Sequence, residues 1–133
     1  MTLYSTTSDN KNLFTSVFEG VSACNNVLYY LPDSPLSDEF KADIAGEVHF
    51  LRAVFYFTLV RLYGDVPIIT TPVLKESDLN VSRSEYQKVY RFILDDLDFA
   101  EKDMRTYVQQ NAVNPGRSRA CVSAVYAVRS LVY

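Results

Sequence analysis

The sequence contains no tryptophan, one histidine and two cysteines among its 133 residues. With His49 as the sole imidazole, there is no second histidine for a metal site and no choice of base for a Ser-His-Asp triad. We therefore expect His49, which lies between Val48 and Phe50, to be a structural histidine. Cys24 and Cys121 are far apart and lack a CxxC neighbour, which favours two buried thiols. A disulfide between them is the alternative, and neither suits a metal site.

Basic clusters, phosphate loops and usable carboxylate pairs are also missing. The 13 lysines and arginines are scattered and the formal net charge is −3, so no face is basic enough to favour nucleic acid. Gly64 and Gly116 are isolated and cannot build a glycine-rich phosphate loop. Asp95 and Asp96 are adjacent, but neighbours on a helix point about 100° apart and cannot act together as acid and base. We expect no enzyme activity, no cofactor and no nucleic-acid partner.

Hydrophobic residues, 48% of the chain, recur mainly at the spacing of amphipathic helices. The pattern predicts helices over about 13–31, 38–63, 84 to 104 or 107, and 119–133. Residues 65–84 are expected to form an extended connection with a short strand-like piece at 66–70. Two short turns and one long connection imply antiparallel pairs. The predicted fold class is therefore all-α, a stack of helical hairpins similar to tetratricopeptide repeats. The last two predicted helices start 34 positions apart, which is the tetratricopeptide period.

Capping residues mark the expected helix ends. Asp9 or Asn10 can cap the first helix, and Ser37 is the natural N-cap of the second. Gly64 suits the left-handed position that closes the second helix. Ser84 has a glutamine three residues later, which is the spacing of a capping box. We therefore expect the third helix to start near Ser84.

Two arginines lie within the very apolar second helix. We place Arg52 and Arg61 on one shared strip because they are nine positions apart. An unpaired buried guanidinium would be very costly, so Arg52 is expected to pair with a carboxylate. Glu47 and Asp96 are the leading partners, and the ion pair is expected to be structural.

The same segment carries a motif that extends beyond it. Residues 46–53 read GEVHFLRA, an aromatic run follows, and residues 62–68 read LYGDVPI. This pattern resembles the signature of SusD/RagB-type outer-membrane lipoproteins of Bacteroidetes: a glutamate, FLRA, an aromatic run and YGxVP. The likeness continues through most of the chain. One departure is Arg119-Ala120, where the family usually has threonine-lysine, so Ser118 must serve as the cap of the last helix.

The resemblance implies a tetratricopeptide-like scaffold in a lipid-anchored protein at the cell surface. Such proteins capture oligosaccharides or other nutrients for a SusC-like TonB-dependent transporter and do not cleave them. Members are several times longer, so residues 1–133 are expected to be the amino-terminal helical part, without the leader and without most of the ligand-binding half. Cys24 lies in a predicted helix and cannot be the family's lipidated cysteine.

Candidate ligand contacts come from the same resemblance. In the family, part of the glycan contact is made near the start of the first helix, which implies Tyr4, Asn10 and Asn12 here. Tyr107 is a further aromatic on an expected loop, whereas most other aromatics fall on helical stripes and favour core packing. Two alternatives to glycan binding stay open: a helical-repeat scaffold for protein interactions without a small-molecule ligand, and a hydrolase.

Overall fold

The computed structural model describes residues 8–72, 82–104 and 120–132. Within these ranges the regular structure is helical, and the β pairing consists of one antiparallel bridge between Val66 and Ser84. The elements are α1 (Ser8–Tyr30), a short 3₁₀ helix η1 (Leu31–Asp33), α2 (Asp38–Tyr63), α3 (Tyr86–Asp103) and α5 (Val122–Val132). The all-α prediction is confirmed.

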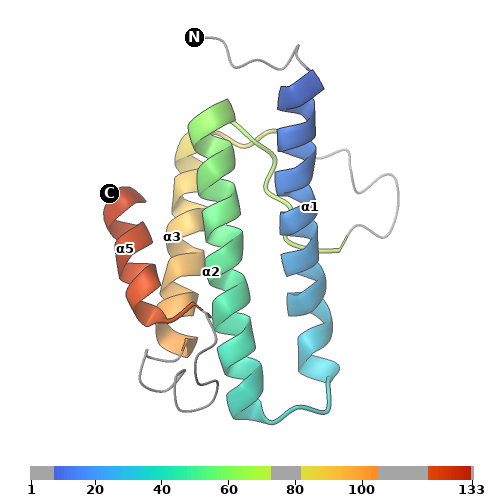
Figure 1. Cartoon of the computed structure of the whole chain (residues 1–133), viewed down its shortest axis with the longest axis vertical. Helices are drawn as coiled ribbons and strands as arrows, with labels where there is room; N and C mark the ends of the chain where they lie inside the picture. The colour runs from blue at the N-terminus through green and yellow to red at the C-terminus, as the bar shows by residue number, and fades with distance from the viewer. Residues whose placement is uncertain (1–7, 73–81, 105–119, 133) are drawn as a thin grey trace.

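The helices α1, α2 and α3 lie side by side with their long axes roughly aligned, and α5 lies against α3 (Figure 1). Successive helices run in opposite directions, so α1 with α2 and α3 with α5 form two antiparallel hairpins. Helix α2 contacts both α1 and α3. A helix packed on two sides needs apolar residues on more than one stripe, which is the pattern in its sequence.

The core lies where α2 meets α3. Tyr56 and Leu59 of α2 have no exposed surface, and neither does Ile93 of α3. Burying a large apolar side chain of this kind contributes about 1.5–3 kcal/mol relative to leaving it exposed. The other fully buried members come from all four α-helices and the extended segment: Val21, Ala53, Val66, Val89, Leu97, Ala100 and Val125.

Both ends of α2 agree with the sequence prediction. The Ser37 hydroxyl oxygen accepts a hydrogen bond from the Phe40 N–H at 3.3 Å, so it caps the first turn. At the other end, the Gly64 N–H donates to the Val60 carbonyl at 3.0 Å. Gly64 has a φ of 71°, a backbone angle that residues with a Cβ adopt only under strain. These local signals therefore set the length of the longest helix.

The predicted start of α3 is wrong by two residues. The N-cap position belongs to Glu85, whose side chain makes no capping hydrogen bond, and Ser84 lies one residue earlier in the β bridge, where its N–H donates to the Val66 carbonyl at 3.0 Å. The helix begins at Tyr86, whose N–H donates to the Asp65 side chain at 2.9 Å. A residue from the connection after α2 thus satisfies the first turn of α3, in place of a local cap.

The predicted start of α1 also needs correction. The helix begins at Ser8, so Asp9 and Asn10 lie inside its first turn and are not its N-cap.

Helix α5 begins at Val122, three residues later than predicted. Ala120 and Cys121 are not helical, and the Cys121 carbonyl accepts from the Ala124 N–H at 2.9 Å as the first turn forms. The expected cap, Ser118, lies outside the described residues. Both cysteines are free thiols, Cys24 buried and Cys121 partly exposed.

The two arginines of α2 do not share a strip, so that expectation is wrong. Nine residues at about 100° each leave the two side chains half a turn apart. Arg52 is buried, with 6% of its surface exposed, whereas Arg61 is exposed and lies over the Phe57 ring at 5.0 Å. Only Arg52 therefore needs a partner within the core.

Candidate functional site

The extended segment after α2 is tied to the helices by buried side chains. The Tyr56 hydroxyl accepts from the Ile69 N–H at 2.8 Å and donates to the Pro67 carbonyl at 3.1 Å. The Asn25 amide of α1 donates to the Ile69 carbonyl at 2.8 Å. Residues from two helices thus satisfy the backbone of a segment that has no sheet or helix of its own.

Behind this segment lies a buried ion pair between α2 and α3. Arg52 Nε donates to Asp96 Oδ2 and Arg52 Nη2 donates to Asp96 Oδ1, both at 2.8 Å. Asp96 is one of the two carboxylates named from the sequence, and it is 2% exposed. The remaining Arg52 nitrogen, Nη1, donates to the side-chain amide oxygen of Asn25, Oδ1, at 3.0 Å. The chain of bonds from Asp96 through Arg52 and Asn25 ends at Ile69, so it connects α3, α2, α1 and the extended segment.

His49 completes the cluster at its outer edge. Its Nδ1 lies 2.7 Å from Asp96 Oδ1, and because a carboxylate paired with arginine can only accept, Nδ1 is assigned as the donor. The His49 ring stacks on Phe99 with centroids 4.8 Å apart, and Phe92 lies under the Arg52 guanidinium at 4.9 Å. These contacts enclose Asp96 and occupy its oxygens. Asp96 is therefore placed for structure, with both of its oxygens already hydrogen-bonded.

Two neighbouring groups are neutral at physiological pH, and burial moves their pKa values further above it. Burial raises the pKa of the Tyr56 hydroxyl to about 12, and it raises the pKa of the Cys24 thiol to about 11. Tyr56 therefore keeps the proton that it donates to Pro67. Cys24 keeps its proton as well, so it is a poor nucleophile and a poor metal ligand.

A groove of about 490 Å³ runs between α1 and the extended segment, on the solvent side of this network. Pro67 and Ile69 form one wall. The rest of the lining comes from α1: Phe14, Thr15, Phe18, Glu19, Ser22, Ala23 and Asn26. Its size lies within the range of small-molecule sites, about 300–1,000 Å³. The groove therefore combines aromatic rings with a carboxylate, an amide and two hydroxyls.

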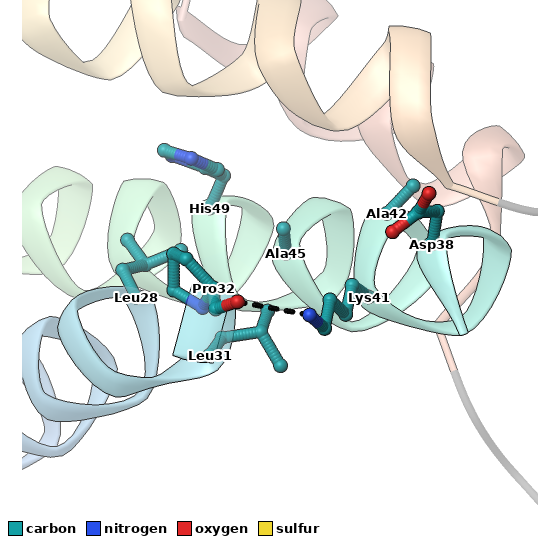
Figure 2. Close-up of a pocket in the computed structure, with 8 residues that line it drawn as sticks. All are labelled: Leu28, Leu31, Pro32, Asp38, Lys41, Ala42, Ala45 and His49. Atoms are coloured by element: carbon teal, nitrogen blue, oxygen red, sulfur yellow. Dashed lines mark hydrogen bonds between the residues drawn. The ribbon is translucent and has the colours of Figure 1, made fainter. Parts of the chain in front are cut away.

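A second hollow, of about 520 Å³, lies where α1 turns into α2 (Figure 2). It is lined mainly by aliphatic side chains: Leu28, Leu31, Pro32, Ala42 and Ala45, with Asp38, Lys41 and His49. The Lys41 amine donates to the Pro32 carbonyl at 2.9 Å across its floor. Fewer polar groups face this hollow, so we take the α1 groove as the candidate ligand site.

The ligand residues expected from the sequence are only partly described. Tyr4 and Tyr107 lie outside the described residues, and Asn10 lies in α1 without a described side chain. Asn12 is exposed on α1, three residues before the groove residue Thr15. The expectation for these residues stays a prediction.

The groove residues Thr15, Glu19, Ser22 and Asn26 were missed from the sequence. Their spacing of four, three and four residues places them on one face of α1. A polar stripe of this kind along one face of an amphipathic helix is the signal that could have identified them. The wall at Ile69 could not have been found from such local spacing. Its hydrogen bond to Asn25 joins residues that are 44 positions apart in the sequence.

Residues 8–72, 82–104 and 120–132 contain no group of three His, Cys, Asp or Glu side chains that could hold a metal ion. Within the same part of the chain, no helix combines the length and hydrophobicity needed to cross a membrane.

Known relatives agree with this architecture. SusD-like protein P2 of Formosa agariphila is 33% identical over 96 residues, which is 69% of this chain and 19% of that protein. The crystal structure of a SusD-like protein from Bacteroides fragilis matches 92% of this chain and 23% of its own, with a TM-score of 0.81 and 32% identity. A laminarin-binding SusD-like protein matches 91% of this chain and 25% of its own, with a TM-score of 0.78 and 28% identity.

The chain thus spans about a fifth to a quarter of the length of these three relatives. A family of SusD-like proteins, described as starch-binding and associating with the outer membrane, matches residues 2–133. Because this match covers almost the whole sequence, the chain belongs to the SusD-like family.

Proposed function

We propose that this protein is a nutrient-binding subunit that captures oligosaccharide at the outer membrane for a SusC-like TonB-dependent transporter. The observation that carries the proposal is the family match over residues 2–133. The similarity to a laminarin-binding SusD-like protein supports a glycan as the ligand class. Capture and transfer, without cleavage, is the role proposed here.

The described residues offer a place to bind but no assembled catalytic group. Asp96 is occupied by Arg52 and His49, and Cys24 keeps its proton. The α1 groove supplies what sugar binding needs, because apolar faces and a few hydrogen-bonding groups are typical of small-molecule sites. Ligand binding therefore agrees better than hydrolysis with the local chemistry.

The placement at the cell surface is part of the proposal. We propose that residues 1–133 are the amino-terminal helical part of a longer protein, held at the membrane by a lipid anchor outside this chain. The length comparison supports this, since the relatives are about four to five times longer than the region they share with it. Further ligand contacts would then come from the rest of that protein.

The test is a binding and association experiment on the protein expressed in its own outer membrane. We expect it to bind starch or laminarin in affinity electrophoresis without releasing shorter sugars, and to co-purify with a TonB-dependent transporter. Co-purification without any glycan binding would favour the alternative, a helical-repeat scaffold for protein interactions. Release of reducing sugar by the purified protein would instead support a hydrolase.

A further inference from the structure

The α1 groove has a charge pattern that selects among glycans. Glu19 is exposed and is the single charged residue among those that line the groove. The nearby Arg52 is buried behind the wall and neutralised by Asp96 at 2.8 Å. An anionic ligand would therefore meet a carboxylate with no cationic lining residue to offset it, and like charges in close contact oppose binding.

The aromatic part of the groove is held in place before a ligand arrives. Phe14 packs edge-on against Tyr63, with centroids 5.1 Å apart and an 86° angle between the rings. Phe18 packs in the same way against Tyr56, at 6.1 Å and 84°. The two phenylalanine rings lie 4.8 Å apart. Because these rings need little further ordering, they can present an apolar surface to a ligand at low entropic cost.

The opposite wall is fixed as well. Ile69 is bonded through its N–H to Tyr56 and through its carbonyl to Asn25, both at 2.8 Å. Asn25 is in turn held by Arg52. The buried network therefore sets the width of the groove, and Asn25, Tyr56 and Arg52 are positioning residues for its wall.

We propose that the α1 groove binds a neutral sugar unit of an oligosaccharide and rejects uronate or sulfated units. The apolar face of the sugar ring packs on Phe14 and Phe18. The Glu19 carboxylate accepts hydrogen bonds from sugar hydroxyls, and the Asn26 amide can donate and accept. This inference rests on the proposed function and adds to it a location and a charge class of ligand.

The test measures binding of matched hexasaccharides to the chain and its variants by isothermal titration calorimetry. Laminarihexaose and maltohexaose are the neutral probes, and hexagalacturonate is the anionic probe. We expect Ala23→Trp, which fills the groove from an exposed position, to weaken binding of the neutral probes by roughly tenfold or more. Ala127→Trp, on the exposed face of α5, is the matched control and should bind as the parent does.

A second pair of variants tests the role of the Glu19 charge. Glu19→Gln should weaken neutral-sugar binding by roughly fivefold to tenfold, because a charge-assisted hydrogen bond becomes a neutral one. The same change should narrow the difference between neutral and anionic probes. Glu39→Gln, at an exposed position in the first turn of α2, should do neither.

Three outcomes would overturn the inference. Parent-like affinity of Ala23→Trp would place the sugar elsewhere and leave the proposed function standing. Equal or tighter binding of hexagalacturonate by the parent would remove the charge selectivity. Absence of binding to both neutral probes would remove the groove as a sugar site, whereas the proposed function would still be decided by transporter co-purification and by glycan binding in the membrane.

Discussion

Two arginines bind carboxylates of α3 from different helices, and their surroundings differ. Arg52 of α2 reaches Asp96 in the core, where 7% and 3% of the two side chains are exposed. Arg129 of α5 reaches Asp98 at 2.8 Å and Glu101 at 2.6 Å, where the carboxylate side chains are 70% and 37% exposed. A buried charge depends on its partner because water cannot replace it, whereas an exposed pair competes with water and salt.

The difference matters for the proposed site. The Arg52 cluster continues through Asn25 to Ile69, so it connects the helix stack with the wall of the α1 groove. The Arg129 cluster instead joins α3 to α5, through Asp98 and Glu101. The buried pair should therefore govern both folding and binding, and the exposed pair should act mainly on the attachment of α5.

The largest expected effect is that of Arg52→Met. Removing the guanidinium leaves Asp96 buried with a negative charge, and breaking a buried pair from one side costs about 3–5 kcal/mol. Urea denaturation should show a large fall in the free energy of unfolding. Arg61→Met, on the exposed side of the same helix, should cost less than about 1 kcal/mol, since it loses only a surface contact with Phe57.

A double variant separates charge from packing. Replacing Asp96 by Leu in the Arg52→Met background removes both charges, so part of the lost stability should return. If the double variant is even less stable than Arg52→Met, the unpaired charge on Asp96 was not the cause of the stability lost in the single variant.

The second-largest loss of stability is expected for Asn25→Asp. The carboxylate can still accept from Arg52, but it cannot donate to the Ile69 carbonyl. The Ile69 carbonyl retains the longer hydrogen bond from the Tyr56 hydroxyl at 3.5 Å, so the loss should lie at the low end of the about 1–3 kcal/mol cost of an unsatisfied buried carbonyl. Hydrogen exchange should become faster at the Ile69 amide, and affinity for the neutral sugar should fall by more than stability alone explains.

Asn26→Asp is the matched control for stability, since Asn26 is the exposed neighbour on the same helix. It should leave the free energy of unfolding and the Ile69 amide nearly unchanged. Equal effects of the two substitutions would show that the amide of Asn25 does not position the wall.

These contrasts also explain how much the sequence could predict. The ends of α2 followed from Ser37 and Gly64, because a cap and a left-handed closing residue act within one turn. The start of α3 did not, because Ser84 is bonded to Val66 and Asp65 caps Tyr86 from outside the helix. Local signals were sufficient where the hydrogen-bond partners were local.

The same limit applies to the site. The cost of burying a charge predicted that Arg52 needs a carboxylate, and it reduced the choice to Glu47 or Asp96. Only the packing of α3 on α2 places Asp96 in contact. The groove depends on a contact between Asn25 and Ile69, and no local pattern reports such a contact.

The third prediction concerns Arg129→Gln. We expect a much smaller loss of stability than for Arg52→Met, because Asp98 and Glu101 can be solvated once the arginine is gone. Adding salt should reduce the difference between this variant and the parent, whereas it should change the effect of Arg52→Met little. A loss as large as that of Arg52→Met would remove the contrast between the two clusters.

The smallest expected effect is the dependence of the α3–α5 contact on pH. The hydrogen bond from Arg129 holds the pKa of Glu101 below its usual value of 4.5. A depressed pKa means that this stabilisation is present above pH 4.5 and is lost as the pH falls through the lower pKa of the folded state. The difference in stability between the parent and Glu101→Gln should therefore be measurable at pH 7 and low salt, and should shrink as the pH falls below 4.5. Glu39→Gln serves as the control, and a difference for Glu101→Gln that stays constant with pH would show that the carboxylate charge does not contribute to holding α5.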